Sequence, residues 1–211
     1  MLITRPNHDI TTNYLCVWSE FVVNCAKGLK KEVIDLFSKR ANYNEFHSII
    51  KKVKPKFLFL NGHGNDETVT GFDNEPILEA SKDLEILFGR IVYARSCRSA
   101  KKLGKMSIKN GCEAYLGYDE DFVFMIDDDF VMKPEKDKIA EMFIKPSNQV
   151  AVSIVKGNSV GEADKKSKEL LKKNIQQLML STVPKWQKDL IPYLLWNYNH
   201  QVCLGDQNAR L

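Results

Sequence analysis

Two residues of this sequence, His63 and Cys97, have the side chains of a cysteine nucleophile and its base. His63 follows the apolar segment "FLFLNG" and lies between Gly62 and Gly64, and Cys97 follows "IVYARS". A free thiol has a pKa of about 8.5, so only a small fraction is thiolate at neutral pH. A neighbouring imidazole and the positive end of a following helix would both favour the thiolate. The pair therefore predicts nucleophilic catalysis, with Cys97 as the nucleophile and His63 as the general base.

The backbone at these two residues could stabilise the negative charge that forms during such a reaction. Gly64 has no side chain, so its N–H is open to a substrate carbonyl. Together with the N–H of Cys97 it would form an oxyanion hole. We expect Gly64 and Cys97 to supply the two donors.

Each residue taken alone has a plainer interpretation. A single cysteine at the end of a strand is more often a small buried apolar residue, and a Gly-His-Gly sequence is usually a loop. The combination favours catalysis, because both residues follow apolar segments and the ends of neighbouring parallel strands lie close together. Motifs of other chemistries are incomplete: "GHGND" is not a full dinucleotide fingerprint and has no Walker lysine, and Cys97 does not begin a Cys-x5-Arg phosphate loop.

Three apolar segments, expected to be buried strands, would position these residues. They are "KFLFL" before His63, "LFGRIVYARSC", which ends at Cys97, and "CEAYLGY", which ends at Tyr118. Uninterrupted apolar runs are typical of strands buried on both faces of a parallel sheet. One helix is predicted before the first of these strands, ending before Pro55, and another between the last two, over residues 99–111. Strands that alternate with helices predict an α/β fold with a mainly parallel sheet.

The flanking segments complete the expected order of elements. Residues 15–25 have helical periodicity and end at Gly28, "EVIDLF" suits a strand or a helix, and "TVTGF" predicts a small hairpin. An acidic loop, a helix at "KDKIAEMFI", a long helix from Val160 and a short final strand follow. No repeat or low-complexity linker divides the chain, so we expect residues 1–211 to form one domain.

The composition argues against several classes of protein. The net charge is +4, and the lysines occur in helical runs such as "KKSKELLKK" rather than in a dense basic arm, which argues against nucleic-acid binding. The five cysteines are widely spread without a CxxC pair, which fits neither a secreted disulfide scaffold nor a structural zinc site. The sequence shows no signal peptide and no apolar run that could span a membrane. We therefore expect a cytoplasmic protein without a membrane partner.

The segments "FLFLNGHGN" and "GRIVYARSCRS" resemble the His-Gly and cysteine blocks of the caspase-haemoglobinase fold, the clan CD cysteine peptidases. Cys97 follows His63 by 34 residues, an interval shorter than in animal caspases and closer to the bacterial gingipain-like and CHAT-domain branches. "CEAYLGY", "KGNSVGEADKKS" and "CLGDQNARL" are similar to later segments of those branches, although Gln207 stands where proline is usual. The resemblance covers about residues 30–211.

This resemblance implies a three-layer α-β-α sandwich and the hydrolysis of a protein or peptide substrate through Cys97 and His63. No segment resembles a separate prodomain or a cleavage linker, so we expect control by a partner protein or a ligand. The alternative is an inactive caspase-like module that binds a partner protein through the same groove.

The resemblance also places a residue of the primary specificity pocket two positions before the cysteine. That residue is Arg95, whose guanidinium would bind a carboxylate through two parallel hydrogen bonds, and this implies cleavage after Asp or Glu. In the alternative, Arg95 pairs with Asp66 or Asp121, and that carboxylate selects Lys or Arg instead.

The acidic segment after Tyr118 and the remaining histidines do not require a functional role. Residues 119–129, the acidic loop, contain six acidic side chains. We expect the acidic loop to be solvated, and a calcium site is the alternative because carboxylate oxygens suit that ion. No other metal site is expected, and His8, His47, His200 and Cys112 are interpreted as structural.

Overall fold

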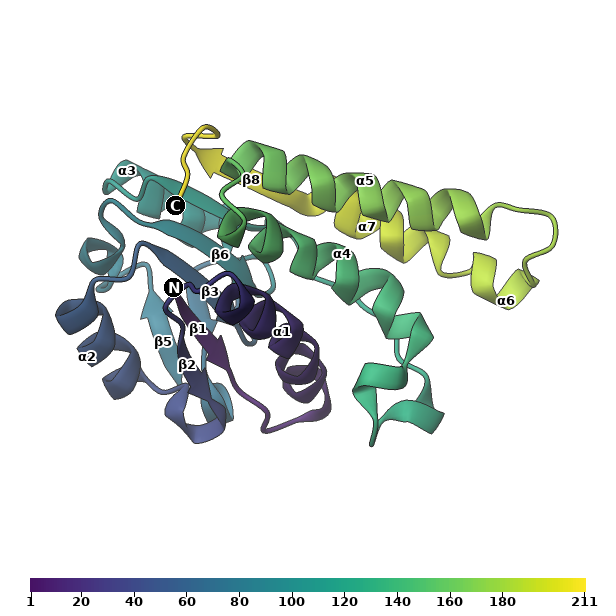
Figure 1. Cartoon of the computed structure of the whole chain (residues 1–211), viewed down its shortest axis with the longest axis horizontal. Coiled ribbons are helices and arrows are strands. Elements are labelled where there is room, and N and C mark those ends of the chain that lie inside the picture. The colour runs from purple at the N-terminus through teal and green to yellow at the C-terminus, as the bar shows by residue number, and fades with distance from the viewer.

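The computed structural model describes all 211 residues, and its centre is a six-stranded sheet (Figure 1). The strand order is β2-β1-β3-β6-β7-β8. These strands are β1 (Leu2–Arg5), β2 (Ile34–Phe37), β3 (Phe57–Asn61), β6 (Ile91–Arg95), β7 (Ala114–Tyr118) and β8 (Gln201–Gly205). Neighbouring strands run parallel except β7 and β8, which pair antiparallel. The prediction of an α/β fold with a mainly parallel sheet is confirmed.

Helices and a hairpin cover the two faces of this sheet, which makes three layers. One face packs against α1 (Ile10–Gly28), α4 (Lys138–Val155) and α5 (Val160–Leu178). The other face packs against α2 (Tyr43–Val53), α3 (Lys105–Lys109) and the hairpin of β4 (Thr68–Thr70) and β5 (Pro76–Glu79). Adjacent strand residues such as Leu58 and Phe59 belong to opposite clusters, because side chains alternate along a strand. Burial on both faces explains the uninterrupted apolar segments.

The strand β1 is not predicted from the sequence. It is four residues long, and two of them, Thr4 and Arg5, are polar. It nevertheless lies inside the sheet, paired with β2 on one side and β3 on the other. Arg5 is tolerated there because its guanidinium binds both oxygens of Asp35 at 3.0 and 2.7 Å.

Local signals explain most of the helix ends. α1 begins after Asp9, whose side chain accepts a hydrogen bond from the N–H of Thr12 in a capping box. α2 ends at Val53, and a π-helical turn at Ala100–Gly104 leads into α3. α4 is longer than predicted because it continues through the buried Pro146, where the apolar packing of the following turns outweighs one lost hydrogen bond. Single 3-10 turns occur at Ser38–Arg40, Phe72–Asn74, Leu84–Leu87, Asp128–Phe130 and Pro134–Lys136.

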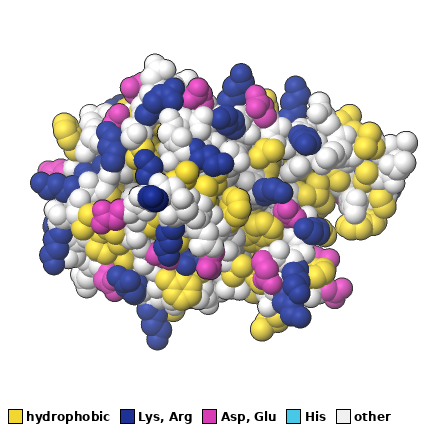
Figure 2. All heavy atoms as spheres, viewed as in Figure 1, with side chains coloured by type: hydrophobic (Ala, Val, Ile, Leu, Met, Phe, Trp, Pro, Cys, Tyr) yellow, Lys and Arg dark blue, Asp and Glu magenta, His cyan; other side chains and the backbone are white.

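Beyond the sheet, α5, the N-terminal half of α4, α6 (Lys185–Lys188) and α7 (Ile191–His200) form an arm with its own apolar cluster (Figure 1). Hydrophobic side chains gather on the surface of this arm (Figure 2). Met179 and Leu180, which follow α5, and Trp186 in α6 are all more than half exposed. Lys and Arg side chains are scattered over the same view rather than gathered in one patch. None of the helices combines the length and apolar composition that a membrane span requires.

Candidate active site

His63 and Cys97 lie at the carboxyl ends of neighbouring strands. β3 and β6 pair in parallel with Asn61 opposite Arg95, so His63 and Cys97 each lie two residues beyond the last pair. The two loops are in contact, because Ser96 Oγ donates a hydrogen bond of 2.8 Å to the carbonyl of His63. The structure thus brings the two predicted residues to the same edge of the sheet.

Gly64 lies where the His63 loop touches the Cys97 loop. A Cβ atom at this position would lie 2.0 Å from Ser96 Oγ and 2.6 Å from the carbonyl oxygen of Thr68, so only glycine fits. Neither the N–H of Gly64 nor that of Cys97 donates a hydrogen bond within the protein. The two expected oxyanion donors are therefore free to bind a substrate carbonyl.

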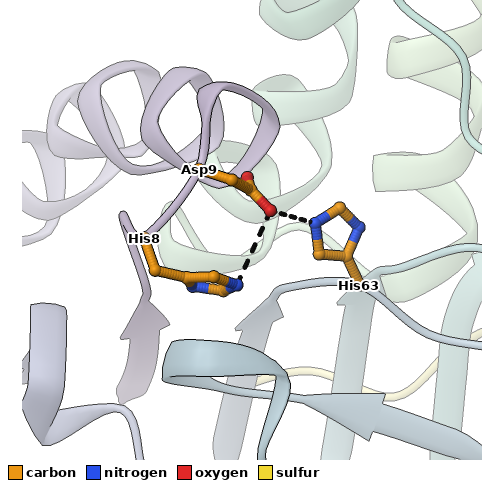
Figure 3. A group of neighbouring side chains, drawn as sticks. All are labelled: His8, Asp9 and His63. Carbon is orange, nitrogen blue, oxygen red and sulfur yellow. Dashed lines mark hydrogen bonds and ion pairs between the residues drawn. The ribbon is translucent and has the colours of Figure 1, made fainter.

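The imidazole of His63 is held by a carboxylate that the sequence analysis does not single out. His63 Nε2 lies 2.6 Å from Asp9 Oδ2 (Figure 3). The same carboxylate accepts a hydrogen bond of 2.7 Å from the N–H of Thr12 at the start of α1. When the Nε2–H of His63 donates to Asp9, the other ring nitrogen, Nδ1, keeps its lone pair.

These hydrogen bonds keep Asp9 ionised. Burial raises the pKa of Asp9, but the hydrogen bonds from Thr12 and His63 outweigh this effect and hold the pKa below its usual value. A negative charge in this place fixes the tautomer of His63 and would stabilise its protonated form. Asp9, three residues before Thr12, forms a helix cap that can be recognised in the sequence. Its position beside His63, however, depends on strand β1, which the sequence does not predict.

Cys97 is a half-buried thiol with no hydrogen bond to His63. Its Sγ atom lies 3.9 Å from the carbonyl oxygen of Phe122. Burial raises the pKa of the Cys97 thiol, the charge of Asp121 adds to this, and Arg98 opposes it. The expectation that the surroundings favour a resting thiolate is therefore wrong, because burial and a nearby carboxylate both disfavour the charged form. A base must remove the proton.

The guanidinium of Arg95 does not line a pocket, contrary to the substrate-binding role expected from the sequence. Its side chain is 0% exposed and lies between the sheet and the helices α1 and α4. It donates hydrogen bonds to Asn61 Oδ1 at 2.9 Å, Asn148 Oδ1 at 2.8 Å and the carbonyl of Leu15 at 3.1 Å. Burial among these neutral partners lowers the pKa of Arg95 to about 10. Arg95 is thus a core residue and cannot reach a substrate.

The pairing that the alternative assigns to Arg95 is made by Arg98 instead. Arg98 Nε lies 3.1 Å from Asp121 Oδ1 and 3.8 Å from Asp66 Oδ1. The Asp121 side chain is 56% exposed, so its carboxylate reaches solvent beside Cys97. Of the two substrate-binding candidates, Asp121 alone lies near the nucleophile.

The side chains of the acidic loop pair with separate partners and do not converge on one point. Asp119 pairs with His200 at 2.9 Å, and Glu120 pairs with Lys101 at 3.0 Å. Asp127 accepts a hydrogen bond from a backbone N–H of the turn that follows it. No three carboxylates of this loop bring their oxygens within 4.8 Å of one another, so the loop lacks the carboxylate cluster on which the calcium alternative rests.

One group of side chains in the chain is arranged so that it could hold a metal ion, and it includes His63. The ligand atoms of His8, Asp9 and His63 all lie within 4.8 Å of one another (Figure 3). The ring centroids of His8 and His63 are 6.1 Å apart. His8 therefore lies beside Asp9 and His63, and its interpretation as a structural residue stays a prediction.

Two other residues interpreted as structural occupy core positions. His47 is buried, and its Nε2 lies 3.1 Å from the carbonyl oxygen of Ile77. Cys112 is also buried, and burial raises the pKa of its thiol to about 12. Neither residue lies in the group formed by His8, Asp9 and His63.

Comparison with known proteins adds no family to this geometry. No protein-family model matches the chain, and no curated protein sequence matches it. The resemblance to the caspase-haemoglobinase fold stays a prediction, and the function is argued from the residues of the site.

Proposed function

We propose that the protein is a cysteine peptidase of the caspase-haemoglobinase type, in which Cys97 is the nucleophile and His63 is the general base. The observation that supports this most strongly is the Asp9–His63 pair, on a loop that contacts the Cys97 loop. An imidazole oriented by a carboxylate, next to a thiol, is the arrangement that activates a nucleophile.

In the proposed reaction, His63 Nδ1 takes the thiol proton as Cys97 Sγ attacks the scissile carbonyl carbon. A C–S bond forms, and the N–H groups of Gly64 and Cys97 stabilise the resulting oxyanion. His63 then protonates the leaving amine as the C–N bond breaks. In the second half of the reaction, His63 takes a proton from water, the hydroxide attacks the thioester, and the proton returns to the departing sulfur.

Substrate binding must bring the two groups closer, since Cys97 Sγ forms its contact with Phe122 and not with His63. Hydrogen bonds between catalytic groups are often long before the substrate arrives. The raised pKa of Cys97 keeps the thiol protonated until His63 engages it. These two features support the proposal that a ligand or a partner protein controls the activity.

The charges near Cys97 support a basic residue before the cleaved bond. Asp66 and Asp121 are both about half exposed, and the single guanidinium of Arg98 balances one of the two carboxylates. The remaining negative charge favours Lys or Arg in a bound peptide. A positional peptide library tests this point, and efficient cleavage after Asp or Glu would contradict it.

The alternative function is an inactive caspase-like module that binds a partner protein. The raised thiol pKa of Cys97 and the lack of a hydrogen bond to His63 favour this alternative. The two functions differ in the reactivity of Cys97 towards a peptide electrophile.

An irreversible peptide probe that alkylates catalytic thiols separates the two functions. We expect the probe to modify Cys97, with loss of peptide cleavage in Cys97→Ala and in His63→Ala. Cys112→Ala is the control, because this buried thiol lies outside the site. Circular dichroism verifies the fold of each variant. A folded native protein that neither cleaves peptides nor reacts at Cys97 supports the binding module.

A further inference from the structure

His8, Asp9 and His63 aim two imidazoles at one carboxylate. Asp9 Oδ2 lies 2.6 Å from His63 Nε2 and 3.6 Å from His8 Nε2. Figure 3 shows both rings directed at this oxygen, with His8 and Asp9 on the segment between β1 and α1 and His63 on the loop after β3. No other three His, Cys, Asp or Glu residues in the chain bring their ligand atoms within this range of one another.

His8 is held in this position mainly by packing. Its side chain is 8% exposed, and its ring meets that of Phe72 edge to face, with the centroids 5.4 Å apart. Its Nε2 has a single weak hydrogen bond of 3.3 Å to Asn74 Oδ1, and its Nδ1 is buried without any partner. The nitrogen that faces Asp9 is Nε2, and it would give up only this one weak hydrogen bond to bind an ion.

The donor atoms match a particular class of ion. Two imidazole nitrogens and one carboxylate oxygen form the set that binds Zn²⁺ with a fourth position left for water. Ca²⁺ and Mg²⁺ prefer oxygen ligands and do not suit two imidazoles. A shallow cavity of about 330 Å³, lined in part by His8, Asp9 and Met132, lies beside two of the three ligands.

Small rotations would complete the coordination. Metal–nitrogen bonds of about 2.0–2.1 Å place neighbouring ligand atoms in a tetrahedral site about 3.3 Å apart. The present gap of 3.6 Å between His8 and Asp9 is close to this value, and the 2.6 Å contact between Asp9 and His63 must widen. The Asp9 and His63 side chains are each 38% exposed and so have room to turn.

We propose that His8, Asp9 and His63 form an inhibitory site for a divalent transition-metal ion such as Zn²⁺. A metal on His63 Nε2 displaces the proton from that nitrogen, and the neutral ring then carries its one proton on Nδ1. Asp9 moves from the imidazole N–H to the ion. An Nδ1 that already carries a proton cannot accept another from Cys97. The inhibition rests on the proposed function, whereas the binding of the ion does not.

Calorimetric titration with Zn²⁺ tests the binding alone. The full-length Cys97→Ala protein removes the nearby thiol as a competing ligand, and His8→Ala is then introduced into this background. We expect His8→Ala to weaken the binding at least about tenfold, because even outer-shell changes cost 10- to 100-fold. His200→Ala is the matched control: His200 pairs with Asp119 at 2.9 Å but has no second imidazole beside it.

Two outcomes of the titration would contradict the proposed metal site. Equal affinity in His8→Ala and its parent would place the ion elsewhere, for example on the half-buried Cys25 or Cys203, and would overturn the site. Competition by excess Ca²⁺ would overturn the assigned class of ion. If His8→Ala does not fold, Asp9→Asn replaces it, since asparagine keeps the cap of α1 and removes the charge. We expect the same weakening in that variant.

Peptide hydrolysis by the protein with Cys97 intact tests the inhibition. We expect Zn²⁺ to stop the reaction and a chelator to restore it. The Zn²⁺ concentration that gives half inhibition should be at least about tenfold higher in His8→Ala. The rate of each variant is normalised to its own rate without metal. Full activity, or activation, with the site occupied would overturn the inhibition. Zn²⁺ binding that depends on His8 in a protein that never hydrolyses peptides would refute the proposed peptidase function and leave the metal site standing.

Discussion

At the scale of single residues, the reactivity of the site depends on which nitrogen of His63 carries a proton. The Asp9 carboxylate contacts Nε2 and so directs the lone pair to Nδ1. The same carboxylate caps α1 through the N–H of Thr12. These two roles can be separated, because asparagine caps a helix as well as aspartate does but carries no charge.

Asp9→Asn is expected to lower kcat by about a hundredfold, which is the lower end of what a positioned acid or base contributes. Its stability should change little because the cap is retained. Steady-state kinetics with a peptide substrate and a thermal melt measure the two effects. Asn42→Asp is the matched control, since Asn42 caps α2 through the N–H of Glu45, away from the site. Equal activity in Asp9→Asn and the native protein would show that the pair does not orient His63.

The charge of Asp121 gives a second test at this scale. Because burial and Asp121 raise the pKa of Cys97, removal of this charge lowers the pKa and leaves more thiolate at neutral pH. In Asp121→Asn we expect alkylation of Cys97 by iodoacetamide at pH 7 to be about two- to tenfold faster. The midpoint of its pH profile should move to lower pH.

Mass spectrometry distinguishes Cys97 from the other four cysteines. Asp129→Asn is the control, because Asp129 belongs to the same acidic loop but does not act on the Cys97 thiol. An alkylation profile in Asp121→Asn identical to that of the native protein would mean that Asp121 does not influence the thiol.

At the scale of elements, the site depends on the close approach of the loops that follow β3 and β6. The hydrogen bond from Ser96 to the His63 carbonyl joins the loops, and Gly64 leaves no space for a side chain between them. Movement of either loop would separate the expected nucleophile from its base. The contact therefore couples the fold of this sheet edge to the chemistry.

Gly64→Ala is expected to force the two loops apart. The added Cβ would overlap Ser96 Oγ, and overpacking of this kind costs about 1–3 kcal/mol of unfolding free energy. Peptide cleavage should fall with it. Gly28→Ala is the matched control, because a Cβ at Gly28 meets no atom within 4 Å. Denaturant unfolding and kinetics of both variants measure the difference, and equal behaviour would refute the tight contact.

At the scale of the whole molecule, the arm supports the segment that follows Asp121. Asn197 on α7 donates a hydrogen bond of 2.6 Å to the carbonyl of Val123 and accepts one of 3.0 Å from its N–H. Trp196 Nε1 donates to the carbonyl of Asp121 at 2.8 Å. The apolar cluster of the arm therefore holds one wall of the candidate site in place.

Two neighbouring leucines on α7 test this support. Leu194 is 0% exposed within the arm cluster, whereas Leu195 is 42% exposed. Leu194→Ala is expected to lower the unfolding free energy by about 2–5 kcal/mol, and Leu195→Ala by far less. We expect one cooperative transition in urea for both variants. Separate transitions of the arm and the sheet in Leu194→Ala would show that the two parts do not stabilise each other.

Apolar runs and helical periodicity sufficed to predict the parallel strands β3, β6 and β7 and most of the helices. These patterns work because burial on both faces of a sheet, or on one face of a helix, requires apolar residues at fixed spacings. They do not predict β1, because four residues with two polar side chains carry no such pattern. They predict too short an α4, because Pro146 suggests a helix end that tertiary packing overrides.

The pattern of residues is enough to predict that His63 and Cys97 follow strands and that the ends of these parallel strands converge. The three-dimensional structure is needed to see that Asp9, 54 residues before His63, contacts its imidazole, and that His8 lies beside them. The reason is that strand order is set by the packing of the whole sheet: β1 lies beside β3, which brings the loop after β1 to His63. The raised pKa of Cys97 and the buried position of Arg95 also follow from the tertiary structure, because burial depends on which helices cover the sheet.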